Sequence, residues 1–285
     1  ITSLYESIKE RRVVHIIKDT AYNNTKTEWD KLPNADKKSI KTGAQSIVET
    51  IFDLEPMVLD SQDDVLTLKI QADKNGEVGV VRSSKSWEIG LSLKHNHFAV
   101  KHNRLSRHID FGEKWYGIKC SDEYWNKINP IFDTLELYRK QGKNWNEITD
   151  KAQSVYLPIL AAFKEELETV QKNATISGKL VEYLLGKFDF YKVVSLDNKR
   201  ETQIFSYNLH GTLNKNVKNT PPKITIPRVF LPDRIVSIEM KPNSDNTLEV
   251  YLNNGWQFSF RIHNASTKVE ASLKFDIQMV GMPTS

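Results

Sequence analysis

Three short runs between residues 65 and 95 have the composition and alternation of β-strands. They are VLTLKI (65–70), VGVV (78–81) and WEIGLSLKH (87–95), and polar turns such as the one at residues 73–76 separate them. Apolar residues at every second position bury one face of a strand, and turns this short join antiparallel neighbours. A run of helical spacing, GAQSIVETIF, comes before them. The sequence therefore predicts a helix followed by an antiparallel meander.

The rest of the chain divides into a helical and a β-rich part. Helical spacing predicts helices over residues 3–18 and 35–52, again from Phe98 to Arg107, and through a helical middle at 121–186, where Pro158 should start or kink its helix. The last hundred residues indicate strands, and Asn253-Asn254-Gly255 between TLEVYL and WQFSFRIH predicts a hairpin. The fold class is therefore α/β in the broad sense, or α+β.

Composition excludes several classes of protein. No run approaches the roughly 18 apolar residues of a membrane span, and no signal peptide is visible. The single cysteine, Cys120, excludes an intramolecular disulfide and a multi-cysteine zinc site, which fits a cytosolic protein with Cys120 in its core. The net charge is only +4, but residues 92–108 carry four Lys or Arg and four histidines without a carboxylate. Such a basic patch suits a polyanion, although a solvated face would have the same composition.

Lys94 stands at the end of the third predicted strand. Alternation puts Glu88, Gly90, Ser92 and Lys94 on one polar face and the leucines on the other. Nucleases of the PD-(D/E)xK class use such a lysine two residues after an acid, with a further acid on the neighbouring strand. Two carboxylates hold Mg²⁺ there, and the lysine orients the attacking water and offsets charge in the transition state. A surface hairpin with a solvated lysine is the alternative.

The acids of such a site are incomplete in this sequence. Ser92 occupies the position of the second acid and adds no charge. Glu88 lies roughly 20 Å from Lys94 along an extended strand, so it could share a metal with Lys94 only if Gly90 interrupted the strand. Glu77 has the right separation for the first acid, and Glu49 on the preceding helix could add a carboxylate. Asp110 and Glu113 are the candidates if the missing acid lies downstream.

The histidines of this stretch allow one other chemistry. His95-Asn96-His97 spells the name of the HNH nucleases, but in that fold the named residues are spread over some thirty positions, so three adjacent residues cannot take their places. His95, His97 and His102 could instead bind zinc as a hydrolase site. No carboxylate or distant histidine is an obvious fourth ligand. A Ser-His-Asp site and a glycine-rich phosphate loop have no support in the sequence.

Several blocks of the sequence resemble one family. WEIGLSLKHNHFAVKHNRLSRHIDFG (87–112) resembles the HaeIII family of type II restriction endonucleases. Later blocks do so as well: GKFDFYKV (186–193), NLHGTLN (208–214), GWQFSFRIHNAST (255–267) and VEASLKFDIQMVGMP (269–283). Together they span most of the chain.

The resemblance implies an enzyme of the PD-(D/E)xK class that cuts double-stranded DNA at GGCC with Mg²⁺ and leaves a 5'-phosphate. The order of helical and β-rich segments then predicts a nuclease core with a helical insertion over 1–200 and a β-rich DNA-recognition part over 201–285, or one undivided domain. Lys94 takes the place of the catalytic lysine, and Ser92 and Glu88 belong to the same strand. A bacterial cytoplasmic location, a DNA methyltransferase acting on the same site and a possible homodimer follow from the family.

One segment departs from the family pattern. An acid-rich segment like Gly-Asp-Val-Arg-Asp is expected before the hairpin, but the chain has GEVGVVR (76–82), in which Glu77 is the one acid. Glu77 then serves alone as the metal-binding acid, or the chain binds DNA but cleaves it poorly or not at all. The second possibility is a rival from another functional class.

Reading G·C pairs from the major groove calls for Arg or Lys opposite guanine and an acceptor opposite cytosine. The preferred base-reading element is the run Arg261-Ile262-His263-Asn264, with a polar turn as its alternative. Asn208 and His210 could form a second contact loop or a simple turn before Gly211. The remaining candidates for contact with DNA follow or flank the catalytic strand: His95, His97, Lys101, His102, Arg104 and Arg107.

Overall fold

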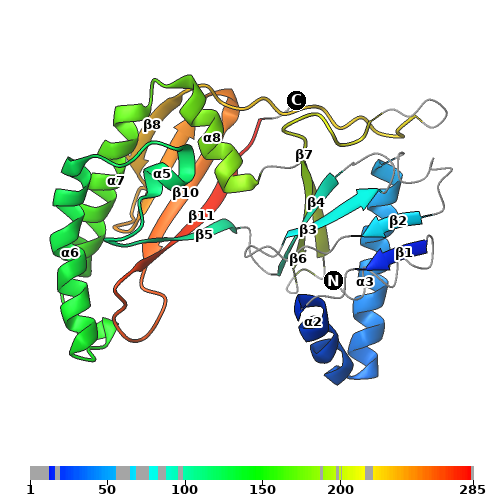
Figure 1. Ribbon diagram of the computed structural model, residues 1–285, viewed down its shortest axis with the longest axis horizontal. Helices are drawn as coiled ribbons and strands as arrows, with labels where there is room; N and C mark the ends of the chain where they lie inside the picture. Colours follow the sequence, from blue (N-terminus) through cyan, green and yellow to red (C-terminus); the bar gives the residue numbers. More distant parts are fainter. Residues whose placement is uncertain are drawn as a thin grey trace. The chain divides into compact units, whose positions relative to one another are not determined.

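The computed structural model describes residues 13–16, 20–55, 65–68, 77–82, 88–95, 99–186, 189–196, 199, 201–215 and 221–283, and for β1 to β4 it describes the backbone. The chain forms two compact units (Figure 1). The first contains residues 1–97 and 188–229, and the second contains 98–187 and 230–284. The helical middle thus belongs with the last strands, so the division does not follow a single boundary near residue 200.

The first unit is built on a six-stranded sheet of order β1-β2-β3-β4-β6-β7. Its strands are β1 (Val13–Ile16), β2 (Val65–Leu68), β3 (Glu77–Arg82), β4 (Glu88–His95), β6 (Phe190–Leu196) and β7 (Glu201–Tyr207). β2, β3 and β4 pair antiparallel, β4 and β6 pair parallel, and β6 and β7 pair antiparallel. The predicted meander is confirmed, and the parallel strand β6 extends it after a long crossover.

Two helices accompany this sheet, α2 (Thr20–Lys31) and α3 (Asn34–Leu54). The predicted second helix is therefore confirmed, and the Pro33 segment separates it from α2 because proline removes a backbone donor. Strand β6 contributes buried side chains to the core of this unit: Phe190, Tyr191, Val193 and Val194 are buried, and the ring of Phe190 stacks on that of Tyr207, with 4.5 Å between the ring centres.

The second unit has a five-stranded antiparallel sheet of order β5-β11-β10-β9-β8. Its strands are β5 (Ala99–Leu105), β8 (Ile235–Met240), β9 (Thr247–Leu252), β10 (Gln257–His263) and β11 (Leu273–Gly281). Its helices are α5 (Phe111–Tyr116), α6 (Asp122–Lys140), α7 (Leu157–Val170) and α8 (Ala174–Leu185), with the short turns η1 (Trp145–Glu147), η2 (Ala152–Tyr156) and η4 (Asn253–Gly255). The predicted helical middle is confirmed, and Pro158 stands in the first turn of α7.

The helices cover one face of this sheet (Figure 1). Phe260 and Phe275 point from β10 and β11 to that face and contact the rings of Trp115 on α5 and Phe163 on α7. Cys120 is buried beside this layer, as predicted. Alternate residues of the same strands are polar and face the other side, which no helix of the second unit covers in the described part of the chain.

The predicted hairpin at residues 253–255 is confirmed between β9 and β10. Asn254 and Gly255 adopt φ angles of 61° and 83°, which asparagine and glycine tolerate best. No helix among the described residues has both the length and the apolar character of a membrane span.

Two helix predictions are wrong. Residues 13–16, placed in a helix from 3 to 18, form strand β1, because Val13-Val14-His15-Ile16 pairs parallel with β2 and β-branched residues fit a pleated sheet. Residues 98–107, given helical spacing, contain β5, whose Asn103 and Leu105 are buried while His102 and Arg104 are exposed. This two-residue period is that of a strand, and β5 is held by pairing with β11, which is distant in the sequence.

Candidate functional site

The register of the first sheet aligns the predicted catalytic positions. Glu77 on β3 is the Cα partner of Ser92 on β4, and Ser92 is in turn the partner of Lys192 on β6. Lys94 follows Ser92 by two positions, and strand positions two apart share a face. The backbone therefore arranges Glu77, Ser92 and Lys94 as one local group of positions at the end of β4.

Glu88 stands apart from this group. It pairs with Val81, six positions from Lys94, and the pairing of β4 with both β3 and β6 runs without a register shift. Gly90 is paired regularly with Gly79, so the strand is not interrupted there. The condition under which Glu88 could share a metal with Lys94 is therefore not met.

Glu49 on helix α3 and Glu55 directly after that helix are carboxylates of different character. Glu49 is half-buried, and Gln45 Nε2 donates to its Oε1 at 3.3 Å. Glu55 is fully buried; Tyr191 Oη donates to it at 2.6 Å, and the Asn214 amide donates at 2.9 Å. Burial raises the pKa of Glu55 to about 7, because desolvation outweighs these two hydrogen bonds, which lower it. Sequence reasoning missed Glu55, although an acid directly after a helix of apolar spacing is a visible signal.

The segment 208–214 is held by hydrogen bonds within the protein. Asn208 is buried; its Nδ2 donates to Ile226 O at 3.1 Å, and its Oδ1 accepts from the Leu213 amide at 3.1 Å. Buried Asp189 accepts from the backbone amides of His210 and Thr212 at 2.7 and 2.6 Å. Asn208 thus has a structural role, while the side chain of His210 is exposed on a fixed loop.

The basic stretch after β4 divides between two faces of β5. Lys101 faces the helices, where its Nζ donates to Tyr183 O at 2.5 Å and lies 3.9 Å from the centre of the Tyr183 ring. His102 and Arg104 face the other side. Arg104 pairs with Glu270 and Ser272, and Arg107, in the turn after β5, pairs with Asp133 on α6. The predicted basic patch is therefore not one surface.

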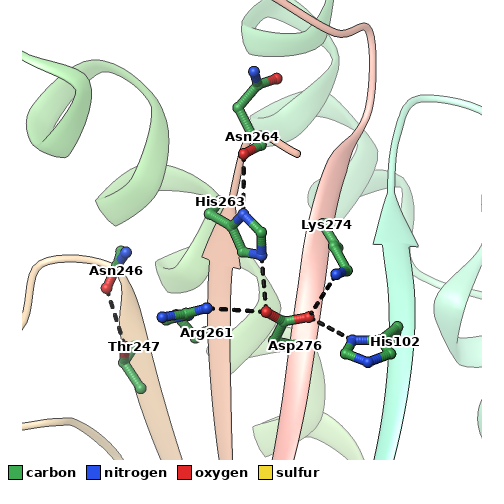
Figure 2. A network of polar contacts seen from close by, with 8 residues as sticks. All are labelled: His102, Asn246, Thr247, Arg261, His263, Asn264, Lys274 and Asp276. Carbon is green, nitrogen blue, oxygen red and sulfur yellow. Dashed lines mark hydrogen bonds and ion pairs between the residues drawn. The ribbon is translucent and has the colours of Figure 1, made fainter. Parts of the chain in front are cut away.

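The open face of the second sheet carries a network centred on Asp276 (Figure 2). Its Oδ1 contacts His102 Nδ1 at 2.6 Å and Lys274 Nζ at 3.3 Å, and its Oδ2 contacts His263 Nε2 at 2.9 Å and Arg261 Nη2 at 3.0 Å. Burial raises the pKa of Asp276, but the hydrogen bonds from His102, Arg261 and His263 outweigh it and hold that pKa well below its usual range. Asp276 was not among the predicted residues; an acid between apolar strand residues, two positions after a lysine, could have indicated it.

The preferred base-reading run lies only partly in a loop. Arg261 and His263 belong to β10, and Asn264 begins the connection to β11. Asn264 Nδ2 donates to the carbonyl oxygens of Ser266 and Lys268 at 2.5 and 2.7 Å, and its Oδ1 accepts from the Glu270 amide at 3.1 Å. Asn264 therefore stabilises the turn, whereas Arg261 and His263 present their side chains on the sheet.

Two alternatives from the sequence find no support in the described part of the chain. There, no cluster of three or more His, Cys, Asp or Glu residues could hold a metal ion, and His102 is engaged with Asp276. His97 lies outside the described residues, and His95 is the last residue of β4. Asp110, the downstream acid, caps α5: its Oδ1 accepts from the Glu113 amide at 2.9 Å. His102 and Asp110 therefore both have partners within the protein, and Asp110 acts as a helix cap.

Comparison with known proteins decides the family. A family model described as HaeIII restriction endonuclease matches residues 1–283. The chain belongs to the HaeIII restriction endonuclease family. Among curated proteins, the type II restriction enzyme HaeIII of Haemophilus aegyptius is 47% identical over 293 residues, covering 100% of this chain and 92% of that protein. No solved structure matches. The resemblance inferred from residues 87–112 and the later blocks is confirmed, and with it an enzyme of the restriction endonuclease type.

Proposed function

We propose that the protein is a type II restriction endonuclease that hydrolyses double-stranded DNA at GGCC. The observation that carries this proposal is the 47% identity to a type II restriction enzyme over the full length of the chain. The match covers 100% of this chain and 92% of that protein, so it extends over nearly all of both sequences. GGCC is the site that the family implies.

The backbone of the first unit supports a PD-(D/E)xK arrangement. Helix α3 precedes the antiparallel strands β2, β3 and β4, and β6 then adds to β4 in parallel. Glu77 supplies the acid of the neighbouring strand, Ser92 stands where the second acid is expected, and Lys94 supplies the lysine. The register between Glu77 and Ser92 is what such a site needs, because it brings the two strands' positions opposite each other.

The donor types of these positions fit a hard divalent cation. Carboxylate and hydroxyl oxygens suit Mg²⁺, and Glu77, with Glu49 as the further carboxylate, would hold it. When bound, Mg²⁺ supplies charge stabilisation at the scissile phosphate.

Lys94 orients the attacking water and stabilises the added negative charge, while Ser92 positions the water by hydrogen bonding. The water loses a proton to solvent as its oxygen bonds to phosphorus, and the bond from phosphorus to the 3'-oxygen breaks. The 3'-oxygen takes up a proton from solvent, which leaves a 3'-hydroxyl and a 5'-phosphate.

Side-chain contacts within the protein reduce the number of residues that we propose to contact DNA. His102, Arg104, Arg261 and His263 lie on the open sheet face and are the proposed contacts, with His210 as a contact from the first unit. The side chains of Lys101, Asn208 and Asn264 donate hydrogen bonds to backbone carbonyl oxygens, so we do not propose them as DNA contacts. A bacterial cytoplasmic location, homodimerisation and a methyltransferase acting on the same site stay predictions from the family.

The rival is a protein that binds GGCC without cleaving it, which the missing second acid favours. Incubation with two plasmids, one carrying GGCC and one from which every GGCC has been removed, separates the two. We expect Mg²⁺-dependent cleavage of the first plasmid alone, and no cleavage in EDTA. Tight GGCC-selective binding without cleavage would establish the rival.

A further inference from the structure

The open face of the second sheet has a regular grid of charged side chains. Two rows cross the strands β10, β11 and β5: in one, Arg261 pairs with Asp276 and Asp276 with His102; in the other, His263 pairs with Lys274 and Lys274 with Arg104. We call these six residues the basic grid. Five of them are basic or imidazole side chains, and the one acid, Asp276, lies in the middle strand.

Charge on this face changes sign beyond β10. The next strands carry Glu249 on β9, opposite Ser259, and Glu239 on β8, opposite Glu249. Lys241 lies 3.8 Å from Glu249, and Glu270 pairs with Arg104 at the edge of the basic grid. A polyanion therefore meets more positive charge over the strands β5, β11 and β10 than over β9 and β8, where Lys241 offsets one of the two glutamates. Three strands span about 10 Å, which is comparable with the roughly 12 Å width of the DNA major groove.

Asp276 is placed to orient its neighbours and not to contact DNA itself. Its side chain is 12% exposed, whereas that of Arg261 is 55% exposed. A carboxylate has about four acceptor positions, and Asp276 has four polar partners, so it has no capacity left for a cytosine amino group. Arg261 uses Nη2 toward Asp276 and keeps its remaining N–H groups for another acceptor.

We propose that the basic grid is the surface that reads guanine in the major groove, and that Asp276 is the positioning residue that aims Arg261 at guanine O6 and N7. The proposal rests on the proposed function, since it assumes a DNA site containing guanine. An arginine fixed in advance loses less conformational freedom on binding and holds the two-point geometry that distinguishes guanine from the other bases. The same pairing explains why an acid stands at the centre of a surface for a polyanion.

The test compares the affinity for a GGCC duplex with that for duplexes in which one G·C pair is replaced, by fluorescence anisotropy at fixed salt in EDTA. In Asp276→Asn we expect this selectivity ratio to fall about 10-fold or more, the discrimination that one two-point arginine–guanine contact supplies. Affinity for the replaced duplexes should stay equal or increase, because a negative charge is lost. If the basic grid contacted only phosphates, Asp276→Asn would instead weaken binding to all duplexes equally, and that result would overturn the proposal.

Two further variants make the outcome decisive. Arg261→Lys keeps the positive charge but removes the forked pair of N–H donors, so it should lower the selectivity ratio as Asp276→Asn does. If Asp276→Asn does not fold, an unchanged selectivity ratio in Arg261→Lys overturns the proposal. Glu249→Gln is the matched control, since Glu249 is a similarly buried acid on the same face, 13% exposed, and should leave the ratio unchanged. If the wild type does not discriminate, the proposed GGCC specificity fails and the proposal falls with it. If it discriminates and Asp276→Asn does so equally, the proposal alone fails.

Discussion

Replacing Glu55 with glutamine should remove a pH-dependent cost from the folded protein. Glu55 is fully buried, and burial raises its pKa from 4.5 to about 7. Each pKa unit corresponds to about 1.36 kcal/mol, so ionisation of this carboxyl costs the folded state about 3 kcal/mol relative to the unfolded chain.

The sign follows from the direction of the shift. The folded state binds the proton more tightly than the unfolded state, so the contribution of Glu55 to the free energy of unfolding is largest below pH 4.5. It is lost as the pH rises through about 7. Glutamine does not titrate, and its amide oxygen can accept from Tyr191 and Asn214. The stability of Glu55→Gln relative to wild type should therefore increase by about 3 kcal/mol between pH 4.5 and 8.

Urea titrations followed by circular dichroism at several pH values in this range measure that difference. Asp53→Asn is the matched control, because Asp53 is an exposed acid in the last turn of helix α3, two positions before Glu55. Its ion pair with Lys223 is solvent-exposed. The control should show little change with pH. A difference between Glu55→Gln and wild type that stays constant from pH 4.5 to 8 would refute the reasoning.

Three other substitutions separate catalytic, structural and binding roles. Lys94→Ala should reduce GGCC cleavage by about 100-fold or more while leaving affinity for the duplex in EDTA unchanged, and retained cleavage would mean that the catalytic strand is misplaced. Asn208→Ala should lower the free energy of unfolding by about 1–3 kcal/mol, because it leaves the groups at Ile226 and Leu213 without partners; unchanged stability in denaturation would show that those bonds are unimportant. Lys101→Met should keep the salt dependence of DNA binding, measured by anisotropy, since its ammonium faces Tyr183; a shallower salt slope would place Lys101 on phosphate.

The local pattern of the sequence was sufficient for much of the fold. The meander of β2 to β4, helix α3, the helical middle and the hairpin at Asn253 all follow from periodicity or from turn residues that act within a few positions. The family followed from blocks such as 87–112 for the same reason, because their residues are adjacent in the chain. The proposed role of Lys94 was likewise inferred from the alternation of one short strand.

Long-range pairing explains what the sequence concealed. Strand β5 has helical-looking spacing, and only its partner β11, about 170 positions later in the chain, makes it a strand. Asp276 contacts His102 on that strand, so no short stretch of the sequence contains all members of the network. Glu55 and Asp189 depend in the same way on loop residues near 210–214. Arg261 and His263 were named from the sequence as base-reading residues, but their position beside Asp276 follows only from the pairing of β10 with β11.

Mapping the ends of cleaved DNA tests the central proposal most directly. Genomic DNA from an unmodified source would be incubated with the protein and Mg²⁺, and both ends of the fragments sequenced, with Lys94→Ala and EDTA as controls. The account predicts 5'-phosphate ends that all fall within GGCC and that disappear in both controls. Ends at unrelated sequences, or no cleavage by a protein that binds GGCC selectively, would contradict it.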